Sequence, residues 1–310
     1  MGLRRSSGRS QGGSRGRAGR GSDDSEAALP EYLRRMGLTP RKALGQHFLI
    51  DEFALGAIAD ACGLDESSTV FEIGCGPGGL TEELAKRAGR VVAVEIDEDL
   101  AALTRSRLTG HPGVCVVAAD ILDFTPAELL AECDATAPYV ACGNLPYYIT
   151  QPIVRRLLEA EMPPTHIVVM VQREVARRLV GGEGQESLLS MSVRCYGNAE
   201  IVLDLPASAF WPEPKVRSSV IRIERLPEPL VPAAIVDRFF NLLRAGFAEP
   251  RKQLHNTLRR AFDLSAEEIT WLLTNAQIDP KLRAQHVGFE DWQRLYDLVE
   301  GRHAEVFDVG

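Results

Sequence analysis

The chain of 310 residues lacks any long run of apolar residues. No stretch reaches the ~18 consecutive apolar residues of a membrane-spanning helix, and no apolar segment follows the pattern of a secretory signal. The six cysteines also lack the paired spacing that a zinc site shows. We therefore predict a cytoplasmic protein with no membrane contact, no bound metal and all six cysteines reduced.

A net positive charge is also absent, because 35 Lys and Arg are outnumbered by 43 Asp and Glu and the net charge is −8. This balance argues against a protein that binds nucleic acid over its whole surface. The distribution is uneven, since residues 1–22 contain several arginines and no acid. An RNA partner would therefore have to meet local basic patches.

The length of the chain and the changes of pattern along it predict three parts. Residues 1–28 are rich in Gly, Ser and Arg, show no apolar periodicity and are predicted to be disordered. Residues 29–226 alternate β-branched strands with helices, which is typical of an α/β fold with a mostly parallel sheet and helices on both faces. Residues 227–310 begin with prolines and continue with four amphipathic helical patterns, so we expect a small α-helical domain there.

A glycine-rich turn follows the first predicted buried strand of this sheet, residues 69–73. The turn contains Gly74, Gly76 and Gly79, and a predicted helix begins directly after it. Strand, glycine turn and helix bring a cofactor close to bare backbone at a helix N-terminus. The same pattern fits NAD-binding sites, so the glycines leave the choice among adenosine cofactors open.

The next two predicted strands each deliver a carboxylate at the end of the strand. Residues 90–96 deliver Glu95, which is placed to accept from both hydroxyls of a ribose, and residues 114–119 deliver Asp120, which is placed to accept from an adenine amine. Either carboxylate alone could be an ordinary strand end. Both together, in this order and one βα unit apart, favour an adenosine cofactor.

Residues 144–147 read Asn-Leu-Pro-Tyr and suggest a site for a base with an exocyclic amine. The Asn144 side-chain oxygen and the Leu145 carbonyl can each accept one amine hydrogen, and Pro146 keeps Leu145 extended. Tyr147 offers a ring on which a purine can stack. Taken alone, the segment could instead be a tight turn after a buried strand, with Tyr147 as packing.

Together, these motifs resemble those of S-adenosylmethionine-dependent methyltransferases that act on adenine amines. Two further segments, residues 42–49 and 210–218, narrow the resemblance to the ribosomal RNA adenine N6,N6-dimethyltransferases. The resemblance extends from about Leu38 to about Leu298. It implies a Rossmann-like methyltransferase domain, S-adenosyl-L-methionine as cofactor, and dimethylation of two adjacent adenosines near the 3′ end of small-subunit rRNA.

The resemblance also assigns roles to particular residues. It implies that Asn144 and Leu145 bind the amine, and that Tyr147 and Phe210 hold the base between two rings. Cofactor contacts are expected from His47, Leu49, Gly74, Gly76, Glu95, Ile96, Asp120, Ile121 and Asn144. Many members of the family carry Asn where this chain has His47. Because the methyl donor is already activated, orientation is needed more than acid–base groups, and no metal is expected.

Basic residues are concentrated in the C-terminal helical region, at Arg244, Arg251, Lys252, Arg259 and Arg260. Such a run can be an ordinary solvated helix face. Next to an RNA-modifying domain it instead predicts that residues 227–310 bind rRNA phosphates. The expected partner is small-subunit rRNA, free or in the assembling subunit, and the expected oligomeric state is a monomer.

Three alternatives remain open from the sequence. Large-subunit (23S) rRNA adenine methyltransferases that confer macrolide resistance share these motifs but commonly read Asn-Ile-Pro-Tyr. A mitochondrial branch acts as a transcription factor, and it would show an amphipathic transit peptide, which we do not find. An oxidoreductase with a Rossmann fold would leave residues 144–147 unexplained.

Overall fold

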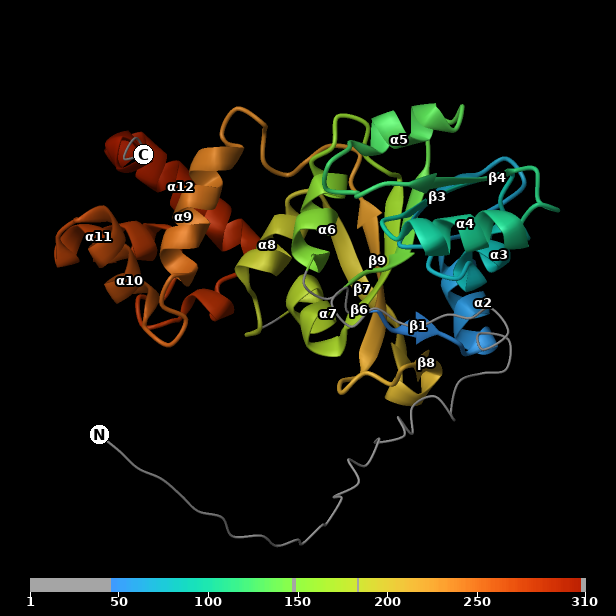
Figure 1. Cartoon of the computed structure of the whole chain (residues 1–310). Coiled ribbons are helices and arrows are strands. Elements are labelled where there is room, and N and C mark those ends of the chain that lie inside the picture. The colour runs from blue at the N-terminus through green and yellow to red at the C-terminus, as the bar shows by residue number, and fades with distance from the viewer. Residues whose placement is uncertain (1–45, 147–148, 183, 308–310) are drawn as a thin grey trace, which may run out of the picture. The chain divides into compact units, whose positions relative to one another are not determined.

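The computed structural model describes residues 46–146, 149–182 and 184–307 (Figure 1). The predicted disorder of residues 1–28 and the predicted stacking role of Tyr147 concern residues outside these ranges. Within the described ranges, no helix combines the length and the apolar character that a membrane crossing requires.

A seven-stranded sheet forms the centre of the α/β part, in the order β4-β3-β2-β5-β6-β9-β7. The strands from β4 to β6 run parallel, and β9 is antiparallel to both β6 and β7. The strands span Thr69–Ile73 (β2), Arg90–Glu95 (β3), Val114–Ala118 (β4), Val140–Asn144 (β5), His166–Gln172 (β6), Gly197–Leu205 (β7) and Ser218–Arg225 (β9). This arrangement confirms the predicted Rossmann-like α/β fold.

Helices cover both faces of this sheet because its central strands are apolar on both sides. In β2, Phe71 and Ile73 pack into the core that also contains residues of α5, α6 and α7, whereas Val70 packs into the core shared with α2 and α3. The helices span Glu52–Ala61 (α2), Gly79–Ala85 (α3), Glu98–Arg107 (α4), Pro126–Glu132 (α5), Thr150–Leu158 (α6) and Arg173–Val180 (α7).

A second, two-stranded sheet joins two segments that are far apart in the sequence. Strand β1 (Phe48–Leu49) pairs antiparallel with β8 (Phe210–Trp211), so that Phe48 is opposite Trp211 and Leu49 is opposite Phe210. The rings of Phe48 and Trp211 stack with their centroids 6.5 Å apart. This pairing places residues 46–49 next to the proline-containing segment that follows Trp211.

The C-terminal region is helical, as the apolar periodicity predicted. It contains α9 (Val236–Phe247), α10 (Leu254–Phe262), α11 (Ala266–Asn275) and α12 (Phe289–His303). These helices share a core around the fully buried Trp292, and a Cβ at Gly246 would lie only 2.2 Å from the Trp292 ring. The same core includes Met191 of α8 (Leu188–Arg194), a helix that the sequence analysis did not identify. The domain boundary at 226/227 therefore stays a prediction.

The prediction that all six cysteines are reduced is wrong for two of them. Cys115 on β4 and Cys133 at the C-terminal end of α5 form a disulfide, with their Cα atoms 5.9 Å apart. A separation of 18 residues in the sequence does not indicate a disulfide. The two side chains meet only because α5 packs beside the edge strand. The other cysteines are free and buried, as expected: Cys62, Cys75, Cys142 and Cys195.

Candidate active site

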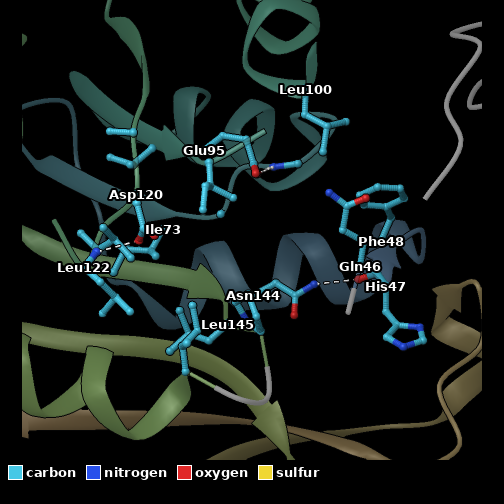
Figure 2. Close-up of a pocket in the computed structure, with 18 residues that line it drawn as sticks. Gln46, His47, Phe48, Ile73, Glu95, Leu100, Asp120, Leu122, Asn144 and Leu145 are labelled. Carbon is cyan, nitrogen blue, oxygen red and sulfur yellow. Dashed lines mark hydrogen bonds between the residues drawn. The ribbon is translucent and has the colours of Figure 1, made fainter. Parts of the chain in front are cut away.

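A pocket lies at the carboxyl ends of the parallel strands (Figure 2). Neighbouring strands β2 and β5 lead into chain segments that continue to opposite sides of the sheet, which is where α/β folds bind ligands. The residues that line the pocket are Gln46, His47, Phe48, Ile73, Gly74, Gly76, Val94, Glu95, Ile96, Leu100, Ala119, Asp120, Ile121, Leu122, Asn144, Leu145, Pro146 and Ile149.

Most of the residues predicted for the site come together in this pocket. Among the described candidates, Leu49 and Phe210 do not line it. Their side chains are 8% and 2% exposed and pack in the core shared with α2 and α3. The roles predicted for these two residues and for Tyr147 stay predictions.

Several wall residues were missed by the sequence analysis, among them Phe48, Leu100, Leu122 and Ile149. Each is apolar and lies within five positions of a motif residue in the sequence. That proximity is the signal that could have identified them.

The glycine turn after β2 has a backbone that other residues rarely adopt. Gly74 and Gly76 have φ angles of 75° and 52°, in the left-handed region that favours glycine. A Cβ at Gly74 would lie 3.5 Å from the Asn144 backbone oxygen, so the turn and the end of β5 are close neighbours. The turn thus brings bare backbone to the pocket wall next to Asn144.

Glu95, at the end of β3, accepts a backbone hydrogen bond at each of its two carboxylate oxygens. Oε2 accepts from the Gly76 N–H at 2.8 Å, and Oε1 accepts from the Asp97 N–H at 3.0 Å. The side chain is buried, and this burial raises the pKa of Glu95, while the two N–H bonds act to lower it. Each oxygen of a carboxylate keeps a further lone pair, so the arrangement fits a pair of ribose hydroxyls.

Asp120 follows β4 and lines the pocket between apolar neighbours. Its Oδ1 accepts from the Leu122 N–H at 2.9 Å, which orients the carboxylate and leaves it further acceptor capacity. Ile96 and Ile121 also line the pocket. Apolar walls together with a fixed acceptor suit a flat adenine ring with its exocyclic amine.

Asn144, the last residue of β5, is oriented by residue 47. Its Nδ2 donates to the His47 backbone oxygen at 3.0 Å, an interaction drawn in Figure 2. The amide oxygen is therefore the atom available as an acceptor towards the pocket. The next residue, Leu145, donates its N–H to the Met170 carbonyl at 3.2 Å, which ties this backbone to β6.

The His47 ring has a hydrogen-bond partner in the segment after β8. Its Nδ1 donates to the Pro212 carbonyl at 2.6 Å, and in Figure 2 the ring points away from Glu95 and Asp120. Residue 47 therefore contacts Asn144 through its backbone and the segment after β8 through its ring. Its predicted cofactor contact stays a prediction.

The glycine turn, the two strand-end carboxylates and the apolar walls suit an adenosine cofactor. Within residues 46–146, 149–182 and 184–307, no three or more His, Cys, Asp or Glu side chains are grouped as metal ligands would be. The prediction of a metal-free reaction stays a prediction. Sheet order and pocket together define a Rossmann-like protein with a site that suits an adenosine cofactor.

Comparison with known proteins gives the family. The family model described as ribosomal RNA adenine dimethylase matches residues 37–300. The chain is 42% identical over 270 residues to "Ribosomal RNA small subunit methyltransferase A" of Dehalococcoides mccartyi strain CBDB1, covering 87% of this chain and 91% of the relative. It is 39% identical to the protein of the same name from Shouchella clausii, covering 86% and 92%. The chain belongs to the ribosomal RNA adenine dimethylase family.

Solved structures agree with this assignment. The 23S rRNA methyltransferase ErmE is 31% identical with a TM-score of 0.67, and the match covers 82% of this chain and 99% of that one. A dimethyladenosine transferase from Plasmodium falciparum has a TM-score of 0.68 at 22% identity, covering 80% and 95%, which shows the same fold.

Proposed function

We propose that this enzyme dimethylates the N6 amines of two adjacent adenosines in the 3′-terminal hairpin of small-subunit (16S) rRNA, during biogenesis of the small ribosomal subunit. The observation that carries the proposal is the position of Asn144. Its oriented amide lies at the edge of the cofactor pocket, where an acceptor for an adenine amine is needed. The names of the relatives from D. mccartyi and S. clausii support the small subunit as the source of the RNA.

The chemistry requires the protein to orient a nitrogen lone pair. When bound, S-adenosylmethionine supplies a methyl group on a positively charged sulfur, and this group is already activated for transfer. In the first transfer the Asn144 amide oxygen and the Leu145 carbonyl accept the two N6 hydrogens, so that the nitrogen lone pair points out of the base plane. In the second transfer the monomethylated amine has one hydrogen left, which one of these two acceptors binds. Glu95 and Asp120 fix the cofactor, and the gain in rate comes from positioning.

The target base needs a stacking surface in addition to these acceptors. We assign this role to Tyr147 and Phe210, whose rings would offset the cost of taking the base out of its stack. In the free protein the Phe210 ring is buried, so its participation requires the β8 segment to move when RNA binds.

Substrate selection falls to the basic residues of the helical region. Arg244, Arg251, Lys252, Arg259 and Arg260 are all exposed, and three of them line a groove between α10 and the start of α11 (Lys252, Arg259 and Arg260). Three acids also line this groove, Glu249, Asp263 and Glu267, and Arg260 pairs with Glu249 at 2.7 Å. We propose that the five basic residues, here called the basic cluster, bind rRNA phosphates of the assembling subunit, and that the enzyme acts as a cytoplasmic monomer.

Large-subunit rRNA is the second candidate substrate, because ErmE shares the fold. The two are separated by incubating the purified enzyme with S-adenosylmethionine and either undermethylated small-subunit particles or large-subunit rRNA, followed by mass mapping of the adenines. We expect two neighbouring dimethyladenosines in the small-subunit RNA and none in the large-subunit RNA. Methylation of the large-subunit RNA alone would overturn the proposal.

A further inference from the structure

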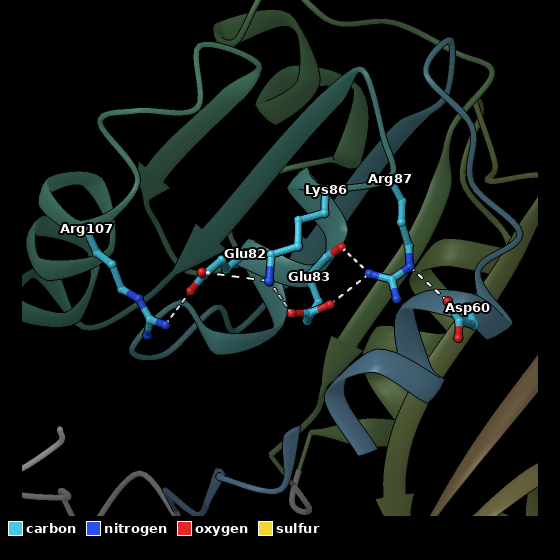
Figure 3. A network of polar contacts seen from close by, with 6 residues as sticks. All are labelled: Asp60, Glu82, Glu83, Lys86, Arg87 and Arg107. Atoms are coloured by element: carbon cyan, nitrogen blue, oxygen red, sulfur yellow. Dashed lines mark hydrogen bonds and ion pairs between the residues drawn. The ribbon is translucent and has the colours of Figure 1, made fainter. Parts of the chain in front are cut away.

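Helix α4 holds the glycine turn through two side chains that the sequence analysis did not single out. The Thr104 hydroxyl, on a fully buried side chain, donates to the Gly76 carbonyl at 2.7 Å. One helical turn later, Arg107 donates to the Pro77 carbonyl at 3.1 Å. Arg107 also pairs with Glu82 of α3, as Figure 3 shows, so the same side chain joins the turn to the helix that follows it.

Gly76 is therefore fixed from both sides. Its N–H donates to Glu95 and its carbonyl accepts from Thr104. Thr104 also packs tightly against the turn, since a Cβ at Gly78 would lie 2.9 Å from the Thr104 methyl carbon. The Thr104 hydroxyl and the Glu95 carboxylate are thus linked through the two backbone polar groups of Gly76.

We propose that Thr104 is a positioning residue for the cofactor, acting through Gly76 on the carboxylate of Glu95. Without its hydroxyl, the buried Gly76 carbonyl loses its donor, and a buried acceptor without a partner is unfavourable. The turn relaxes, Glu95 loses its preset orientation, and the ribose hydroxyls meet a less ordered acceptor. The proposal rests on the proposed function only through the assignment of this pocket to S-adenosylmethionine.

The test compares Thr104→Val, which removes the hydroxyl at nearly constant volume, with Thr104→Ser, which retains it. Calorimetric titration with S-adenosylhomocysteine should show a Kd raised roughly ten-fold in Thr104→Val and close to wild type in Thr104→Ser. Ser106→Ala removes a hydroxyl from the exposed side of the same helix and should leave the Kd unchanged. Amide exchange at Cys75, Gly76 and Gly78 in the free protein should rise in Thr104→Val only.

Two readouts separate positioning from a general loss of structure. At saturating cofactor, kcat of Thr104→Val should stay near wild type while KM for the cofactor rises. In a Glu95→Gln background, the effect of Thr104→Val on Kd should largely vanish, because both changes act on one chain of hydrogen bonds. An unchanged Kd in a folded Thr104→Val protein, or full additivity with Glu95→Gln, would overturn the proposal.

A failure of Thr104→Val to fold is covered by a second variant. Arg107 is partly exposed, and Arg107→Met removes the other donor to the turn. A raised Kd for S-adenosylhomocysteine in Arg107→Met would support the proposal that side chains of α4 position the glycine turn. An unchanged Kd would contradict it. If the wild-type protein itself fails to bind S-adenosylhomocysteine, the proposed function fails instead.

Discussion

The side-chain amide of Asn144 donates to the backbone carbonyl of His47 at 3.0 Å. A carbonyl can only accept, so this contact fixes which end of the amide faces the pocket. The same segment makes two further contacts. Gln46 Nε2 donates to Asp97 Oδ2 at 3.4 Å, and the His47 ring donates to the backbone carbonyl of Pro212, which follows β8. The orientation of the Asn144 amide thus depends on residues 46–49, which connect both sides of the pocket.

Replacing Asn144 should affect chemistry more than cofactor binding. Asn144→Ala removes one of the two acceptors for the target amine, and we expect kcat to fall at least roughly a hundred-fold, as misplacement of reacting groups commonly causes. The Kd for S-adenosylmethionine should change little. Single-turnover methylation and calorimetric titration measure the two effects, and a near wild-type rate would refute the role of the amide.

Replacing Glu95 should have the opposite pattern. Glu95→Ala removes a buried acceptor, and the loss of hydrogen bonds to a charged group should weaken S-adenosylmethionine binding by about 2–3 kcal/mol. Glu132→Ala, at an exposed position on α5, is the matched control. Unchanged affinity in a correctly folded Glu95→Ala protein would rule out the assignment to the ribose.

The buried Glu72 predicts a stability that depends on pH. Its side chain is 1% exposed on β2, and burial raises its pKa to about 7, with the nearby Glu95 adding to the rise and the Thr81 hydroxyl opposing it. In the unfolded chain the group ionises at its ordinary pKa of 4.5. Between these two values the unfolded state loses its proton first, so stability contributed by this group falls as pH rises from about 4.5 to about 7.

Glu72→Gln removes this dependence. The variant should gain free energy of unfolding relative to wild type as pH rises, by on the order of 3 kcal/mol between pH 4 and pH 8. Urea unfolding at the two pH values measures the difference, and Glu132→Gln provides the exposed control. If the free energies of unfolding of Glu72→Gln and wild type differed by the same amount at both pH values, the pKa of Glu72 would not be raised by folding.

The basic cluster should control RNA binding without affecting the cofactor. Replacing Arg251, Lys252, Arg259 and Arg260 by glutamine should weaken binding to small-subunit particles. It should also reduce the salt dependence of binding, by a slope of roughly 0.7–0.9 for each phosphate that is no longer neutralised. A control pair, Lys86→Gln with Arg155→Gln, removes exposed charge from the residue after α3 and from α6. If affinity and slope both stay at wild-type values, the cluster is only a solvated helix face.

The sequence was sufficient to predict the parts of the site that follow strand ends. Gly74, Glu95, Asp120 and Asn144 each come directly after or at the end of an apolar run, and the carboxyl ends of parallel strands meet at one edge of a sheet. The mostly parallel sheet followed from the alternation of strands with helices, and the four C-terminal helices followed from apolar periodicity. These features depend on local patterns of a few residues.

Contacts between distant segments could not be predicted from such patterns. Asn144 and His47 are 97 positions apart, and the pairing of β1 with β8 has no local signal because each strand has only two residues. Thr104 looks like any other residue of an amphipathic helix until its contact with Gly76 is seen. The disulfide between Cys115 and Cys133 likewise depends on how α5 packs.

The proposed activity is tested most directly by mass mapping of adenines in the rRNA of a strain that lacks this protein. We expect two adjacent dimethyladenosines near the 3′ end of small-subunit rRNA to disappear, and the wild-type gene to restore them. The gene for Asn144→Ala, expressed at the same level, should not restore them. Retention of both modifications in the deletion strain, or full restoration by Asn144→Ala, would overturn the proposed activity.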